Sequence, residues 1–284
     1  HDNAFNEVAS IILEFNNSKQ DMRERKSERN ENIDFRERWK ERSRQMFDSS
    51  EGRKAFENVF DHETKKALLK LGDRKVLDRL YGTIESGKES SVFLADTSDG
   101  ERVIVKIYMT QAGSFREMEK YLRGDQRFRN FKSDRRSVIN EWCKKEFKNL
   151  KKASSVVSCP EPKAFQKNIL VMEFIGEEFT PYPKLKEINI ENPEEAFQKI
   201  KKNIKELWRE EKIVHGDLSE YNVLMTEEGE VWIDSSKGVH KSHPEAVELL
   251  KRDVRNMASF FSRQGADIDE QEAVEQVLEA LEDL

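Results

Sequence analysis

The sequence of 284 residues predicts an α+β protein, and its length suits one two-lobed domain or two small ones. Between residues 80 and 108, apolar residues follow the period of two that is typical of strands. Beyond residue 190, apolar residues recur at helical intervals in several long segments. Apolar residues make up 36% of the chain and charged residues 37%, so we expect a modest core beneath a heavily charged surface.

Changes in composition divide the chain. Residues 1–50 are highly charged and lack Gly and Pro, which predicts a long exposed helix or a segment that orders on binding. We expect the main domain over 51–265, with an N-terminal lobe at about 76–175 and a C-terminal lobe at about 176–265. The acidic residues 266–284 predict a last helix.

Two features indicate where the protein works. Cys143 and Cys159 form no C-x-x-C pair, which indicates reduced thiols in a cytosolic protein rather than a zinc site. No apolar run approaches the ~20 residues that a membrane span needs. We therefore expect a cytoplasmic protein without a membrane partner.

The first strands carry a glycine-containing loop. "YGTIES", "SSVFLA" and "VIVKIYM" read as three strands, with a turn at Asp99-Gly100 between the last two. The segment 82–90, "GTIESGKES", nearly fits the Walker loop G-x-x-x-x-G-K-[ST]. However, Glu89 stands where a metal-binding hydroxyl is needed, and a strand follows rather than a helix. The loop is therefore interpreted as one that covers phosphates between two antiparallel strands.

Helices and short strands alternate after this segment. Residues 134–155 have a helical pattern, and "NILVMEFIG" is a short apolar run that indicates a buried strand. A further helix begins at Asn192, which can cap it, followed by Pro193 in the favoured first position. "EVWID" predicts another strand, and residues 243–265 predict a helix that ends at a glycine.

The strongest chemical signal is His215-Gly-Asp-Leu-Ser-Glu-Tyr-Asn222, which has the spacing of a kinase catalytic loop. Asp234 follows twelve residues after Asn222, at the end of a predicted strand. Amide and carboxylate oxygens suit Mg²⁺, so Asn222 and Asp234 are candidate metal ligands. Asp217 is then free to orient or deprotonate an attacking hydroxyl. A lone Asp-x₄-Asn is common, and His215 by itself favours a packing role.

Lys106 lies inside an otherwise apolar strand, where a charge needs a partner. Nucleotide phosphates and a helix glutamate would supply one, with Glu146 favoured over Glu141. The alternative is an outward-facing lysine on an edge strand. "VMEFI" would be a hinge whose backbone from Glu173 to Ile175 meets adenine, or else simply a core strand.

These motifs together resemble the RIO family of atypical kinases, most closely its archaeal Rio-one type. The resemblance runs from about Val59 to Phe261 and depends most on "SGKES", "DLSEYN" and "RDVRN". It implies a two-lobed protein-kinase-like fold with a short C-terminal lobe. It also implies a serine/threonine protein kinase with ATPase activity that uses ATP and Mg²⁺, or alternatively Mn²⁺. The partners it implies are the maturing small ribosomal subunit with its rRNA, and the protein itself through autophosphorylation.

The resemblance also assigns roles to residues. Asp217 would be the catalytic base, Asn222 and Asp234 would bind the metal, and the aspartate matching Asp234 is linked to a phospho-aspartate intermediate. Glu173 and Ile175 would line the adenine pocket. The residues implied in ATP binding are Ser86, Gly87, Lys88, Glu89, Val92, Lys106 and Glu146.

The chain departs from the usual pattern at several places, including the two serines of "SGKESSV" where Ala-Asn is common. Gly216 stands where alanine is usual, and "SSKGV" after Asp234 replaces more hydrophobic or Gln-containing versions. Ser219 occupies the position of the usual lysine of a kinase catalytic loop. This loop therefore brings less positive charge to the phosphates, and we expect Lys88 to compensate.

Two other functions fit the motifs. A small-molecule kinase of the aminoglycoside or choline kinase type shares H-G-D-x-x-x-x-N, although only 50 residues follow Asp234 to form its substrate subdomain. A nucleotide-sensing assembly factor with negligible turnover is the second alternative. The stretch from Arg116 to Lys152 carries 13 basic and 6 acidic residues, which fits either RNA binding or a solvated helix face.

Overall fold

The computed structural model describes residues 60–111, 113–128 and 130–282, together with Glu41, Arg44, Arg53 and Phe56. The extension predicted over 1–50 therefore lies almost wholly outside the described residues. The helices are α3 (His62–Asp73), α4 (Phe115–Gly124), α5 (Arg135–Ala153), α6 (Pro193–Glu206), α7 (Ala246–Arg263) and α8 (Glu270–Glu282). Short helical turns are η1 (Gln126–Phe128), η2 (Leu185–Glu187), η3 (Leu207–Glu211) and η4 (Ser235–Lys237).

The N-terminal lobe is built on a five-stranded antiparallel sheet in the order β1-β2-β3-β5-β4. Its strands are β1 (Arg79–Ser86), β2 (Ser90–Asp96), β3 (Arg102–Tyr108), β4 (Pro162–Gln166) and β5 (Ile169–Glu173). The loop between β1 and β2 is tight, since the Gly87 N–H donates to the Ser90 carbonyl at 2.9 Å. This geometry agrees with the rejection of a Walker loop, because the loop joins two antiparallel strands.

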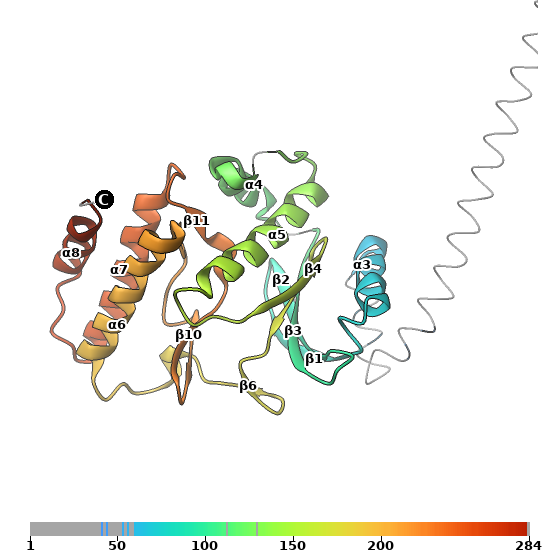
Figure 1. The fold of residues 1–284 in the computed structure, drawn as a ribbon, viewed down its shortest axis with the longest axis horizontal. Helices are drawn as coiled ribbons and strands as arrows, with labels where there is room; N and C mark the ends of the chain where they lie inside the picture. Colours follow the sequence, from blue (N-terminus) through green and yellow to red (C-terminus); the bar gives the residue numbers. More distant parts are fainter. Residues whose placement is uncertain are drawn as a thin grey trace, which may run out of the picture.

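Two helices cover the two faces of this sheet (Figure 1). The leucines of α3 pack with Phe56, Phe60 and the sheet in one apolar cluster, and α5 packs against β4 and β5 on the opposite face. Strand β3 is therefore buried on both faces, which explains its nearly continuous apolar sequence. Each large apolar side chain buried here contributes roughly 1.5–3 kcal/mol. Helix α3 ends at Asp73, directly after Gly72.

Helix α5 links the two lobes. It begins at Asp134, whose side chain accepts a hydrogen bond from the Ser137 N–H at 3.0 Å, as an N-cap should. Its buried face carries three polar residues, Lys145, Glu146 and Asn149. Buried polar groups need partners, and these three find theirs in β3 and in the segment after Asp234.

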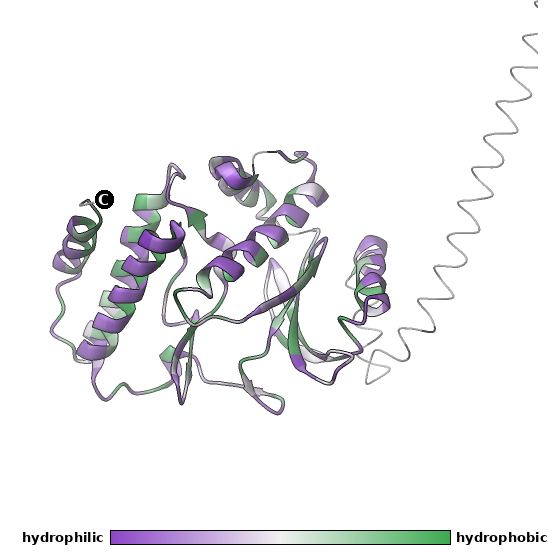
Figure 2. Ribbon diagram, in the orientation of Figure 1, coloured by the Kyte–Doolittle hydropathy of each residue, from purple (hydrophilic) through white to green (hydrophobic). Residues whose placement is uncertain are grey.

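The C-terminal lobe combines helices with short strands. The strands are β6 (Gly176–Glu177), β7 (Thr180–Pro181), β8 (Ile213–Val214), β9 (Val223–Thr226), β10 (Gly229–Trp232) and β11 (Val239–His240). The side chain of Asn192 caps α6 as predicted, although its 3.4 Å contact with the Glu195 N–H is long. Helix α7 alternates apolar and polar stripes and buries its apolar one against α6 and α8 (Figure 2). The α+β class and the two-lobed arrangement are thus confirmed.

Every helix in the described part of the chain is too short or too polar to cross a bilayer.

Candidate active site

A cleft of about 570 Å³ opens between the sheet and the C-terminal lobe. This volume falls within the range of pockets that bind small molecules and cofactors. The predicted residues that line it are Gly87, Lys88, Glu89, Val92, Lys106, Glu173, Ile175, Asn222 and Asp234. Glu146 lies beneath the floor, and Ser86 lies beside the loop with its hydroxyl 3.2 Å from that of Ser91. The sequence therefore identified residues from six separate segments that the fold brings to one cleft.

Lys106 is the central group of the cleft floor. Its side chain is 6% exposed, and its Nζ donates to Glu146 Oε1 at 2.8 Å and to Asp234 Oδ1 at 3.0 Å. Burial would lower the pKa of Lys106, but the charges of Asp234 and Glu146 outweigh it and hold the pKa above its usual value. Lys106 is therefore a cation that joins both lobes. Glu141 instead pairs with Lys144, so Glu146 is the helix glutamate of this site.

Glu146 is fully buried and has a second partner in the Tyr108 hydroxyl. Burial raises the pKa of Glu146 despite the opposing charge of Lys106. Burial also raises the pKa of Tyr108 well above its usual value, so Tyr108 remains a hydrogen-bond donor. The sequence offered no signal for the role of Tyr108, because its contact with Glu146 depends on the packing of β3 against α5.

Asp234 stands at the bottom of the cleft, directly after β10 and Ile233. Its backbone is left-handed, with φ at 59°, and its Oδ1 also accepts from the Ser236 N–H at 3.3 Å. Partial desolvation would raise the pKa of Asp234, but the Lys106 charge and these hydrogen bonds hold it well below its usual range. Asp234 is therefore an anion, and its side chain is still 40% exposed, which leaves it accessible to a cation.

Asn222 lines the same cleft as Asp234. Its Nδ2 donates to the Asp217 carbonyl at 2.8 Å, which assigns the amide orientation and leaves Oδ1 as an acceptor. The Ile233 N–H donates to the Asn222 carbonyl at 2.9 Å and fixes the loop to the strand before Asp234. One amide oxygen and one carboxylate are a fitting donor set for Mg²⁺, which commonly takes its other ligands from phosphates and water.

Helix α7 holds the loop of Asp217 from below. Asp253 is 1% exposed and accepts from the backbone N–H groups of Gly216 at 2.7 Å and Leu218 at 2.9 Å. Burial raises the pKa of Asp253 to about 7, against these hydrogen bonds. Arg252 donates to the Gly216 carbonyl, and Asn256 donates to the Leu218 carbonyl at 3.1 Å. The sequence pattern assigns no role to the motif "RDVRN", and its contacts show that it anchors this loop.

Asp217 has a lysine neighbour that the sequence did not predict. Lys237, at the end of η4, places its Nζ 3.2 Å from Asp217 Oδ1. Ser219 is uncharged, and the cation nearest to Asp217 among the described residues is Lys237. The expectation that Lys88 brings charge to the phosphates stays a prediction, and Lys88 does line the cleft. The charge of Asp217 in turn raises the pKa of Lys237 against partial burial.

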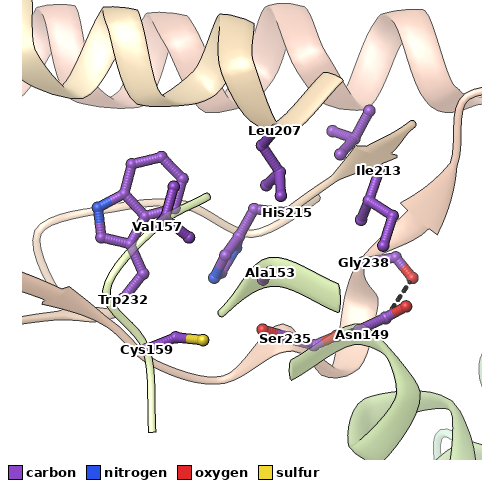
Figure 3. A pocket seen from close by; sticks show the side chains of 11 residues that line it. Asn149, Ala153, Val157, Cys159, Leu207, Ile213, His215, Trp232, Ser235 and Gly238 are labelled. Carbon is purple, nitrogen blue, oxygen red and sulfur yellow. Dashed lines mark hydrogen bonds between the residues drawn. The ribbon is translucent and has the colours of Figure 1, made fainter. Parts of the chain in front are cut away.

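A very small cavity of about 10 Å³ lies behind the same loop (Figure 3). His215 lines it together with Trp232, whose ring lies edge-on at a centroid distance of 6.0 Å. His215 Nε2 lies 3.1 Å from the Ile233 carbonyl, and burial lowers the pKa of this imidazole. His215 therefore acts as a neutral packing residue, as its sequence context favoured.

Hydrophobic residues on both sides of the cleft complete the site. The sequence did not single them out, since each reads as an ordinary core residue. These residues are Ile84, Ile104, Met172, Leu224 and Ile233. Their apolar side chains give the cleft surfaces against which a flat ring can pack.

Known proteins resemble this chain in sequence and in fold. The family model described as "RIO domain" matches residues 91–274. A RIO-type serine/threonine-protein kinase Rio1 of Haloferax volcanii is 43% identical over 217 residues, which cover 76% of this chain and 74% of the relative. Its counterpart in Methanocaldococcus jannaschii is 41% identical over 214 residues, covering 75% and 73%. The crystal structure of a Rio2 kinase-ADP/Mg2+-phosphoaspartate complex from Chaetomium thermophilum has a TM-score of 0.56 at 20% identity, covering 75% of this chain and 65% of that one.

Proposed function

This chain belongs to the RIO family of serine/threonine kinases, and we propose that it binds ATP with Mg²⁺ in the cleft between its lobes and transfers the γ-phosphoryl group. Kinases of this family use ATP and a divalent metal. One observation carries the residue assignment: the buried Lys106 meets Glu146 from one lobe and Asp234 from the other on the cleft floor. A buried cation beside an aspartate and a glycine loop is the arrangement that nucleotide phosphates require.

ATP would lie with its adenine toward the hinge and its phosphates toward Lys106. The Glu173 N–H already donates to the Glu161 carbonyl, and the Ile175 carbonyl accepts from the Tyr182 N–H. Adenine would therefore meet the Glu173 carbonyl and the Ile175 N–H. Lys88 and the backbone of the β1–β2 loop would cover the phosphates.

The metal would be held by Asn222 Oδ1 and the Asp234 carboxylate, hard oxygen donors that suit Mg²⁺ and Mn²⁺ alike. When bound, it would neutralise charge on the phosphate oxygens. Asp234 would have to exchange part of its contact with Lys106 for the metal, and Lys106 would turn its charge toward the phosphates.

Asp217 would orient an attacking serine or threonine hydroxyl and accept its proton. The hydroxyl oxygen forms the new bond to the γ-phosphorus while the bond to the ADP oxygen breaks, and ADP leaves. With water as the acceptor, the same step is ATP hydrolysis. Helix α7 contributes by keeping the backbone on both sides of Asp217 fixed through Asp253.

The variant Lys106→Met tests this proposal. We expect it to lose ATP turnover by at least ~100-fold, because its charge cannot be replaced by neighbouring groups. Lys163→Met is the matched control, since Lys163 lies on β4 of the same sheet and pairs with the surface residues Glu101 and Glu161. Turnover is measured below the melting temperature of each variant, with circular dichroism as the check of folding. Near-normal turnover by folded Lys106→Met would rule out the assigned site.

A covalent step at Asp234 is the second candidate, favoured by its exposed and ionised carboxylate and by the phosphoaspartate of the similar Rio2 complex. An Asp234 oxygen would attack the γ-phosphorus, ADP would leave, and water would later release phosphate. Acyl phosphates are cleaved by hydroxylamine, whereas phosphoserine is not. Acid-quenched protein labelled from ATP should therefore lose label in hydroxylamine. If all of the label survives hydroxylamine and maps to serine, Asp234 is restricted to metal binding.

We also propose that the protein acts in maturation of the small ribosomal subunit, with rRNA on the basic face of α4 and α5, and that it phosphorylates itself. Exposed residues of this face include Arg116, Lys132 and Arg135. Arg127 does not belong to this set, because it pairs with the buried Asp125 at 2.6 Å. Purification of the native complex with and without ATP tests the role in small-subunit maturation, because small-subunit particles should then co-purify with the protein.

A further inference from the structure

We propose that Lys237 is a positioning residue for Asp217, an inference that rests on the proposed function. Its Nζ lies 3.2 Å from Asp217 Oδ1 and the two side chains are 34% and 37% exposed. Within the described ranges, no other side chain is hydrogen-bonded to the Asp217 carboxylate, whose Oδ2 has no hydrogen bond, and the Arg252 guanidinium forms only a longer ion pair at 3.9 Å. Lys237 thus holds one carboxylate oxygen and leaves the other to receive the proton of the acceptor hydroxyl.

The backbone that carries Lys237 is held rigidly. Asn149 Nδ2 donates to the carbonyls of Ser235 at 2.9 Å and Gly238 at 2.8 Å, and Figure 3 shows this amide beside both residues. Lys145 Nζ donates to the Ser236 carbonyl at 2.6 Å. Both donors are buried on α5, so three carbonyls around Lys237 are fixed to the core. The backbone at Lys237 is therefore fixed, so only the torsions of its own side chain have to be ordered for the contact with Asp217.

Gly216 allows this backbone to come close to the loop of Asp217. Its φ is +76°, and a Cβ at this position would lie only 2.8 Å from the Lys237 carbonyl oxygen. Any larger residue would push the 235–238 segment away from the loop. The glycine directly before Asp217 therefore brings Lys237 within reach of the carboxylate.

The other cation near Asp217 does not substitute for Lys237. Arg252 Nη2 is 3.9 Å from Asp217 Oδ1, beyond hydrogen-bond distance, and donates to the Gly216 carbonyl instead. Ser219 carries no charge. The ammonium group of Lys237 is thus the group that orients the Asp217 carboxylate before the acceptor hydroxyl binds.

The test measures steady-state ATP turnover and phosphorylation of a serine peptide by wild type, Lys237→Met and Lys237→Arg. We expect kcat of Lys237→Met to fall roughly 10- to 100-fold with KM for ATP unchanged, the range for a misplaced catalytic group. Lys237→Arg should recover most of the rate, because it restores a donor cation. Lys144→Met is the control, since Lys144 is 35% exposed and pairs at 3.0 Å with Glu141.

A double-mutant cycle with Asp217→Asn separates positioning from a general structural effect. In the Asp217→Asn background, Lys237→Met should cause no further loss, because the group that it positions is gone. Additive losses, or a raised KM for ATP with unchanged kcat, would overturn the inference. Wild type that neither binds nor cleaves ATP would overturn the proposed function itself, whereas normal turnover by Lys237→Met alone would remove only the role of Lys237.

Discussion

The variant Lys106→Met should unfold more easily at alkaline than at acidic pH. It leaves Glu146 fully buried, with only the Tyr108 hydroxyl among its present side-chain partners. Burial already raises the pKa of Glu146, and removal of Lys106 takes away the charge that opposes this effect. In the variant, the folded-state pKa of Glu146 therefore exceeds the unfolded value of about 4.3 by a larger margin than in wild type. The stability of the variant that depends on protonated Glu146 is present below pH ~4.3 and is lost as pH rises through the folded-state pKa.

The size of the effect follows from the burial of the pair. Removing one partner of a buried ion pair costs about 3–5 kcal/mol. For domains of 150–250 residues, each kcal/mol shifts Tm by about 2–4 °C. A loss of about 3 kcal/mol therefore corresponds to a Tm that is lower by about 6–12 °C at pH 8. At pH 5, where Glu146 can take up a proton, the loss should be clearly smaller.

Thermal unfolding followed by circular dichroism at both pH values measures this difference. Glu146→Gln in the Lys106→Met background should recover most of the loss at pH 8, since it removes the stranded charge. Lys144→Met breaks a half-exposed pair with Glu141 instead and should change Tm by no more than about 2 °C. An equal Tm loss at both pH values, or no recovery by Glu146→Gln, would refute the reasoning.

Two further outcomes follow. The folded-state pKa of Asp253, about 7, lies above its unfolded value, so Asp253 lowers the free energy of unfolding as pH rises from about 4 to 7. In Asp253→Asn, the free energy of unfolding measured with urea should therefore depend less on pH over this range, and an unchanged pH dependence would contradict the reasoning. Neutralising Arg116, Lys132 and Arg135 to Gln should weaken rRNA binding and reduce the slope of log K against log salt by up to about three, whereas an unchanged slope would leave these residues as a solvated face.

Much of the site could be predicted because its residues lie in short local motifs. The spacing from His215 to Asn222 and the strand end at Asp234 are contained in one stretch of twenty residues. The apolar strand around Lys106 required a buried partner, and its pairing with Glu146 is present in the structure. The helical pattern of residues 134–155 likewise predicted α5 within two residues.

The remaining parts of the site depend on tertiary contacts. Lys237 reaches Asp217 only because Asp234 adopts a left-handed backbone and η4 turns back toward Gly216. Asp253 contacts the same loop from a helix more than thirty residues further along the chain. Neither contact has a periodic or spacing signal, so packing in three dimensions decides both.

The central claim, that Asp217 lies outside the lining of the cleft and serves the chemical step on ATP bound there, is tested most directly by Asp217→Asn. Titration calorimetry with ATP and Mg²⁺ measures binding, and phosphate release with peptide phosphorylation measures turnover. The account predicts ATP affinity within about twofold of wild type, because Asp217 does not line the cleft, and turnover reduced by at least ~100-fold. Wild-type turnover by Asp217→Asn would contradict it.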